Sequence, residues 1–71
     1  MGKRIQIREL RRLTGWSQYR LAAATGIERT RLSLFENNHI VPTVTEQAAI
    51  EQVLLEEIER RSEQLRAALS A

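Results

Sequence analysis

The chain has 71 residues, enough for one small domain, and its 11 lysines and arginines against nine acidic residues give a net charge of +2. It contains no cysteine and a single histidine, and all nine acidic residues are glutamate. This composition excludes disulfides and thiolate chemistry and argues against an enzyme, a bound metal or a cofactor.

The N-terminal sequence MGKRIQIREL lacks the apolar stretch of a signal peptide. No long uncharged apolar run follows it, so we expect no membrane span. On these grounds we expect a cytoplasmic protein.

The charge is distributed unevenly along the chain. Residues 1–31 contain eight basic and two acidic side chains, a net charge of +6, whereas residues 32–71 contain three arginines and seven glutamates, a net charge of −4. A basic half joined to an acidic half indicates a surface that binds a polyanion, with the acidic part kept away from it. The alternative is an ordinary solvated charged face.

A first helix is expected over residues 3–13, from about Lys3 to Leu13. Ile7, Leu10 and Leu13 recur at a spacing of three residues and predict one core-facing side. Gly15 is the expected end of this helix, because glycine adopts the left-handed conformation of a helix C-terminus.

A second helix is expected between Ser17 and Gly26. Ser17 is a favourable N-cap, and Gly26 ends the helix in a left-handed conformation at little steric cost. The free N–H groups of such a helix N-terminus hold a phosphate well. Gln18, Tyr19 and Arg20 lie in this first turn and are available to the same phosphate.

A third helix is expected from Glu28 to Asn37. Leu32 and Phe35 face inward, whereas polar and cationic side chains face outward. Two short helices joined by a tight turn, with the second presenting its outer face, form the outline of a helix-turn-helix. The outward set predicted to contact DNA bases is Arg29, Thr30, Ser33 and Leu34.

The chemistry of this outer face suits the major groove of double-stranded DNA. An α-helix fits that groove, and the residues at its N-terminus reach base edges first. Arg29 is able to donate two hydrogen bonds to guanine, and Thr30 to bond a base or contact a thymine methyl group. Leu34 suits a thymine methyl group alone. The alternative is that these residues are plain helix surface.

The chain after the third helix predicts a turn and then a helix start. Asn38 is the residue best suited after glycine to a left-handed position. Thr43 and Glu46 have the spacing of a capping box, in which each side chain bonds the other residue's backbone N–H.

From Val44 to Ala71 no glycine, proline or asparagine interrupts the chain. Apolar residues recur there at three and four residues with one polar gap, as in a coiled-coil seam. The seam consists of Leu55, Ile58, Ser62, Leu65 and Leu69. A single helix over residues 44–69 is about 39 Å long, too long for so small a domain to cover. We expect a second copy to cover the seam; the alternatives are a fold-back after a bend near Leu55, or a frayed end.

Several segments together resemble the phage repressor and Cro type of helix-turn-helix, the Xre family. The resemblance covers residues 7–54. It is carried by IRELRR at 7–12, GWSQ at 15–18, LAAATGI at 21–27, LSLFENN at 32–38 and Pro42-Thr43. Taken together these segments are specific, whereas each alone is a weak signal.

The resemblance implies roles for individual residues. Arg11 and Glu36 match a partly buried ion pair that joins the first and third helices. Arg29, Thr30 and Leu34 match positions that usually touch bases, although Leu34 replaces a commonly polar residue. The predicted phosphate contacts are Gln18, Tyr19, Arg20, Arg31, Asn37, Asn38 and His39.

We therefore predict an all-α protein with a compact four- to five-helix repressor-like DNA-binding domain, residues 1–54, and an extended C-terminal helix, residues 55–71, for dimerisation. The predicted function is a sequence-specific regulator of the Cro/C1 type, a homodimeric repressor at a palindromic operator. Its two third helices would lie about 34 Å apart, in successive major grooves. The alternative is a DNA-binding antitoxin or adaptor whose C-terminal helix binds another protein.

Overall fold

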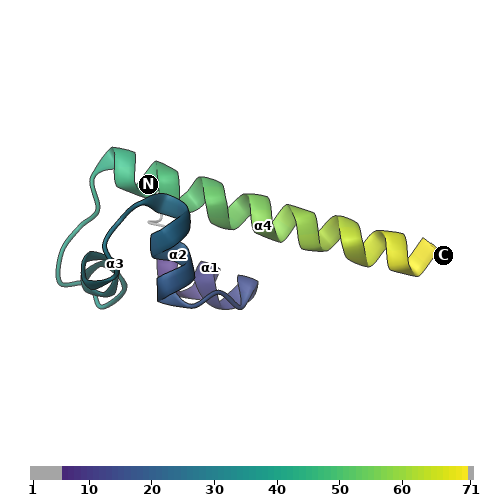
Figure 1. The fold of residues 1–71 in the computed structure, drawn as a ribbon, viewed down its shortest axis with the longest axis horizontal. Coiled ribbons are helices and arrows are strands. Elements are labelled where there is room, and N and C mark those ends of the chain that lie inside the picture. The colour runs from purple at the N-terminus through teal and green to yellow at the C-terminus, as the bar shows by residue number, and fades with distance from the viewer. Residues whose placement is uncertain (1–5, 71) are drawn as a thin grey trace.

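The computed structural model describes residues 6–70, which form four α-helices and no strand (Figure 1). The helices are α1 (Ile7–Thr14), α2 (Gln18–Thr25), α3 (Arg29–Glu36) and α4 (Val44–Ser70). The predicted all-α architecture with a long C-terminal helix is confirmed.

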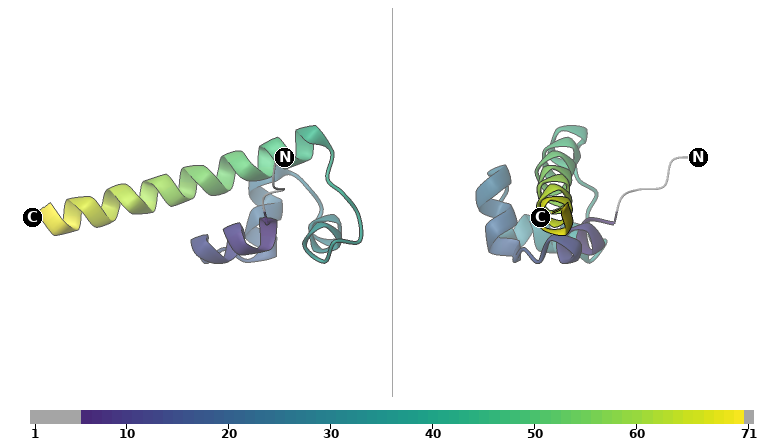
Figure 2. Two further views of the ribbon diagram at one scale, coloured as in Figure 1. Left: turned by 180° about the vertical axis from the view of Figure 1, so that it is seen from behind. Right: turned by 90° about the vertical axis from the view of Figure 1, so that its right-hand side faces the viewer.

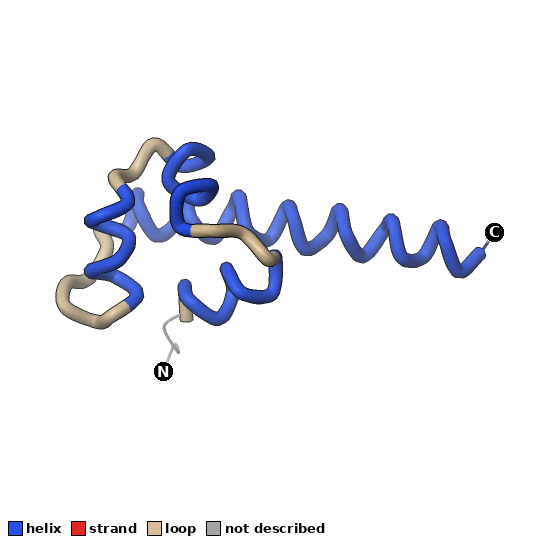
Figure 3. The backbone as a smooth tube through the Cα atoms, turned by 60° about the horizontal axis from the view of Figure 1, so that its bottom comes forward, coloured by secondary structure: helices blue, strands red, loops and turns tan. Residues whose placement is uncertain are grey.

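The three short helices gather against the first half of α4. The second half of α4 extends away from them, as both side views show (Figures 1 and 2). Tan loops in Figure 3 mark the short connections that hold α1, α2 and α3 close together. The long helix therefore has one half inside the domain and one half outside it.

The core contains at least one apolar residue from every helix. Its buried members are Ile7, Leu21, Leu32, Phe35, Ile50 and Leu54. Burying each of these side chains contributes about 1.5–3 kcal/mol relative to exposure. Since Ile50 and Leu54 lie on α4, the long helix contributes to the core and is not only an appendage.

The helix ends have the conformations that their residues predict. Gly15 and Gly26 end α1 and α2 with φ angles of 75° and 77°. Ser17 caps α2 by accepting a hydrogen bond from the backbone N–H of Arg20 at 3.1 Å. These three residues fix where the chain turns, and so fix the angle between α1, α2 and α3.

The end of α3 forms a Schellman motif around Asn38, which has a φ of 61°. The N–H of His39 donates to the carbonyl of Leu34, and the N–H of Asn38 donates to that of Phe35. The left-handed conformation predicted for Asn38 is thereby confirmed.

One expectation for the first helix is wrong. α1 begins at Ile7, with Gln6 as its N-cap, and the start expected near Lys3 lies outside the described residues. Leu13 is 70% exposed, and Thr14 is buried in its place. The buried hydroxyl of Thr14 donates a hydrogen bond to the carbonyl of Arg11 and accepts one from the backbone N–H of Trp16.

The start of α4 is the predicted capping box. The backbone N–H of Thr43 donates to the carboxylate of Glu46, and the N–H of Glu46 donates to the hydroxyl of Thr43. The helix then continues for 27 residues without a break, so a fold-back near Leu55 does not occur. None of the helices within residues 6–70 combines the length and the apolar character that crossing a membrane requires.

Candidate nucleic-acid interface

The first turn of α3 presents an open, cationic surface. Arg29 and Thr30 are exposed, Leu34 is at the margin of exposure and Ser33 is partly buried. The buried Leu32 and Phe35 hold the opposite side of the helix in the core. The tail of α4 leaves this face uncovered, so the four residues predicted to contact bases share one accessible side.

Arg29 does not project freely into solvent, because its guanidinium stacks over the ring of Tyr19. The guanidinium carbon lies 4.6 Å from the ring centroid. Tyr19 is in the first turn of α2, so the stack joins the two helices of the helix-turn-helix. A cation over an aromatic face is stabilised by the ring quadrupole, and the stack restricts the directions in which Arg29 presents its donors.

Arg20 makes a similar stack with Trp16, at 4.5 Å from the guanidinium carbon to the ring centroid. Trp16 precedes α2, and Arg20 lies in the first turn of that helix, which Ser17 caps. Arg20 is exposed at the N-terminal end of α2. The stack therefore holds a cation beside the free N–H groups of that helix end.

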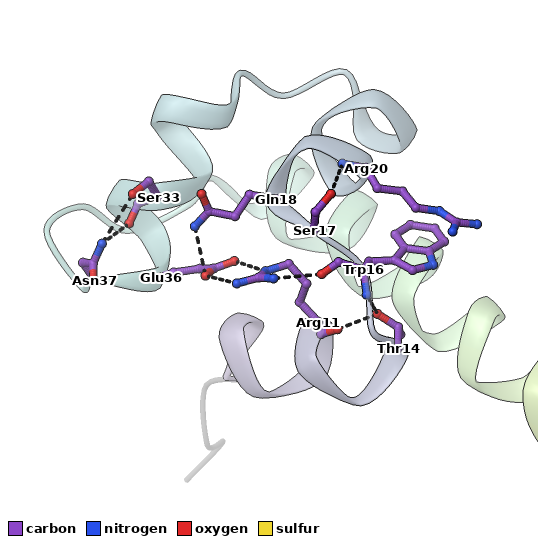
Figure 4. Close-up of polar contacts among 9 residues, drawn as sticks. All are labelled: Arg11, Thr14, Trp16, Ser17, Gln18, Arg20, Ser33, Glu36 and Asn37. Carbon is purple, nitrogen blue, oxygen red and sulfur yellow. Dashed lines mark hydrogen bonds and ion pairs between the residues drawn. The ribbon is translucent and has the colours of Figure 1, made fainter.

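A buried network connects α1, the start of α2 and the end of α3 (Figure 4). Arg11 donates from its Nε to one carboxylate oxygen of Glu36 at 2.7 Å and from a terminal nitrogen to the other at 2.9 Å. Its remaining terminal nitrogen donates to the carbonyl of Trp16 at 2.8 Å. Gln18 also donates to Glu36, at 3.2 Å.

This network sets the ionisation of Glu36, whose side chain is 2% exposed. Burial by itself raises the pKa of this carboxyl group, but the hydrogen bonds from Arg11 and Gln18 outweigh burial and lower the pKa below its ordinary value. Gln18, predicted to contact phosphate, is thus held in position from inside the protein.

Arg31 is paired within the protein. Its Nε and one terminal nitrogen donate to the two carboxylate oxygens of Glu46. The hydrogen bonds from Arg31, joined by the one from the backbone of Thr43, lower the pKa of Glu46 to about 2. The predicted phosphate contact of Arg31 therefore comes from a guanidinium whose charge is already balanced.

The loop after α3 places three predicted phosphate contacts together. Asn38 and His39 are exposed in the turn, and their backbones complete the end of the helix. Asn37 is also exposed, and its side-chain amide donates to the carbonyl of Ser33 at 2.9 Å. Contacts of these residues with DNA stay predictions.

The five seam residues of α4 lie along the part of the helix that leaves the domain. Leu55, Leu65 and Leu69 are 45%, 66% and 84% exposed, whereas Ile58 and Ser62 are partly buried. A shallow groove is formed where α1 meets this seam. Its lining consists of Leu13, Ile58, Arg61, Ser62 and Leu65.

Two ion pairs are not apparent from the sequence. Arg31 and Glu46 are 15 residues apart on different helices, and no local spacing connects them. On α4, the spacing of four residues predicts the pairs Glu56–Arg60 and Glu57–Arg61; the second is present, whereas Arg60 also pairs with the buried Glu57 and not with Glu56.

Comparison with known proteins agrees with this geometry. Searches of curated proteins and of solved structures gave no match. A family model described as helix-turn-helix matches residues 7–59, which include α1, α2, α3 and the first half of α4. The chain therefore belongs to the helix-turn-helix family of DNA-binding transcription regulators, of the Cro/C1 or Xre type.

Proposed function

We propose that this protein is a repressor that binds a palindromic operator as a homodimer, with α3 of each copy in a major groove. The observation that carries the proposal is the open first turn of α3, where Arg29 and Thr30 are exposed and the core fixes the opposite side. The residues of a helix N-terminus reach base edges first. This is the arrangement that reading a base sequence requires.

Binding is divided between two sets of residues. Arg29, Thr30, Ser33 and Leu34 discriminate bases, and a good bidentate contact such as Arg29 with guanine is worth about 1–3 kcal/mol. The start of α2, Arg31 of α3 and the loop after α3 contact the DNA backbone and set the position of the domain. Gln18, Tyr19, Arg20, Arg31, Asn37, Asn38 and His39 form that second set.

Dimerisation through α4 follows from the exposure of its seam. Leu65 and Leu69 would lose most of their solvent exposure against a second helix. Two copies bound at one operator then occlude the DNA on which they lie, which is repression by steric exclusion. Two-fold symmetry in the protein requires a palindrome in the operator.

Selection of bound sequences from random double-stranded DNA tests the proposal. We expect a palindrome whose half-sites are spaced for two copies of α3 on one side of the duplex. Recovery of a single half-site would contradict the dimer, and recovery of no enriched sequence would contradict sequence-specific binding.

A second candidate is a DNA-binding antitoxin or adaptor whose α4 binds another protein. The exposed Leu65 and Leu69 favour it as well, since an apolar face accepts any complementary helix. Sedimentation of the pure protein separates the two candidates. A stable dimer supports self-association, and a monomer at all accessible concentrations supports a different protein partner.

A further inference from the structure

We propose that the two α4 helices pair in antiparallel orientation, so that Ile58 of each copy faces Leu69 of the other and Ser62 faces Leu65. The proposal rests on the dimer proposed above and specifies its geometry. Each groove between α1 and α4 then receives the C-terminal end of the second copy's α4.

The shape of the groove fits this occupant. Leu13 is 70% exposed on α1, and together with Ile58 it lines the inner end of the groove. In the antiparallel register, Leu69 of the second copy arrives at Ile58, beside Leu13. The most exposed leucine of the tail thus covers the most exposed leucine of the domain.

Charge complementarity selects the orientation. In the heptad repeat of the seam the flanking e positions are Glu59 and Arg66, and the g positions are Arg61 and Ala68. Parallel helices place each g residue near an e residue of the next heptad, which sets Arg61 against Arg66 twice. Antiparallel helices place e beside e, which sets Glu59 against Arg66 twice and leaves Arg61 beside Ala68.

Glu59 and Arg66 are available for such contacts. Within residues 6–70 neither side chain takes part in an ion pair, and both are exposed. Arg61, by contrast, is paired with Glu57 on its own helix. Glu59 and Arg66 are therefore two charges beside the seam that the antiparallel arrangement pairs with opposite charges and the parallel arrangement does not.

The position of the domain on α4 gives independent support. The g flank of the seam faces the domain. Leu54, one heptad before Arg61, is fully buried, and a terminal guanidinium nitrogen of Arg61 lies 3.7 Å from the position that a Cβ atom on Gly15 would occupy. Antiparallel helices bring g flanks to the same side of the pair, whereas parallel helices bring them to opposite sides. The antiparallel dimer therefore places both DNA-binding domains on one side of the helix pair.

Charge reversal tests the orientation. The dimer dissociation constant is measured by sedimentation equilibrium at low ionic strength, where screening is weak. For Glu59→Arg and for Arg66→Glu we expect a rise of about tenfold, because two attractive pairs become repulsive. The double variant Glu59→Arg/Arg66→Glu restores both pairs, and its constant returns near that of the unmodified protein.

The outcomes separate this proposal from the proposed function. Glu63→Arg makes the same charge change as Glu59→Arg, but on the outer side of α4, and we expect it to leave the dimer dissociation constant unchanged. Tighter association of Arg66→Glu would show a parallel dimer, since the introduced carboxylate would then meet Arg61 of the second copy. No effect of any variant on a stable dimer would overturn the α4 interface, and a monomeric unmodified protein would overturn the dimer itself.

A distance measurement provides a second readout that does not depend on affinity. The chain has no cysteine, so Ser70→Cys creates a unique labelling site on an exposed helix end. Antiparallel pairing offsets the two labelled positions by about 20 Å along the helices. Parallel pairing places them side by side, and a short distance between spin labels would reject the proposal.

Discussion

Arg31 in the first turn of α3 and Glu46 in the first turn of α4 bind each other through two hydrogen bonds. The same arginine stacks over the ring of Phe35, a core residue of α3. The pair therefore connects the helix proposed to read bases with the helix proposed to join two copies. Because Glu46 also forms the capping box of α4, a substitution of Glu46 is expected to affect both α3 and α4.

Pairing with Glu46 predicts a small contribution of Arg31 to the salt dependence of DNA binding. A cation that neutralises a phosphate adds about 0.9 to the slope of log affinity against log salt concentration. We expect Arg31→Ala to change that slope by less than half this amount, because the charge of Arg31 is balanced within the protein. Arg20→Ala is the matched control, because Arg20 forms no ion pair within residues 6–70, and it lowers the slope by about one. Equal slopes for the two variants would show that Arg31 leaves Glu46 for a phosphate.

Arg29→Ala is expected to relax base preference. Loss of a bidentate contact removes about 1–3 kcal/mol of discrimination at one base pair, while affinity for random DNA changes little. Titration of operator and random duplexes at one salt concentration measures both effects. Arg20→Ala serves as the comparison, since it weakens both complexes alike. An equal loss on the two duplexes for Arg29→Ala would refute its assignment to bases.

Because Arg29 stacks on Tyr19, we expect the aromatic ring of Tyr19, and not only its hydroxyl group, to affect discrimination between operator and random DNA. Tyr19→Phe keeps the aromatic face and retains operator discrimination, losing at most a phosphate contact. Tyr19→Ala frees Arg29 and lowers discrimination several-fold, because a stacked cation contributes about 0.5–1 kcal/mol at an exposed site. The same duplex titrations measure this, and equal behaviour of the two variants would show that the ring does not orient Arg29.

Local chain chemistry predicted the helix ends well. Gly15, Gly26 and Asn38 are in the left-handed conformations expected of them, and Thr43 and Glu46 form the expected box. Each of these features is decided by residues within about four positions of one another. Such interactions exist in any context that lets the helix form, so the sequence alone suffices to identify them.

Among interactions between distant segments, the Arg11–Glu36 pair implied by the family resemblance is present, but others were missed. The spacing of Leu10 and Leu13 suggested a core face, but α1 ends at Thr14, and the turn at Gly15 leaves Leu13 outside. The partner of Arg31 was missed because Glu46 already had a local role as a cap. In both cases the deciding factor is where α4 lies against α1 and α3, which no short spacing records.

Acid should destabilise the protein through its paired glutamates. Hydrogen bonds from Arg60 and then Arg61 lower the pKa of Glu57 to about 2. A carboxyl group whose pKa is lower in the folded state stabilises the fold above its unfolded value, near 4.5, and this contribution is lost as pH falls toward 2. We expect the thermal midpoint to be steady from pH 7 to about 5 and then to fall.

Glu57→Gln tests the origin of that fall. The variant is less stable than the unmodified protein above pH 4.5, and the difference between the two narrows toward pH 2, where Glu57 is protonated. Thermal unfolding followed by circular dichroism across this range measures both curves. A difference that stays constant with pH would assign the stabilisation to packing of the side chain and not to its charge.

The Arg11–Glu36 pair should be the most sensitive polar contact in the fold. Removing one charge of a buried pair strands the other, at a cost of about 3–5 kcal/mol. Stabilities of small domains are of the same order, so Glu36→Gln is expected to populate the unfolded state strongly. The double variant Arg11→Met/Glu36→Leu strands no charge and should recover part of the loss. Denaturant unfolding measures the three free energies; a loss below about 1 kcal/mol for Glu36→Gln would mean that water reaches Arg11 and replaces its partner.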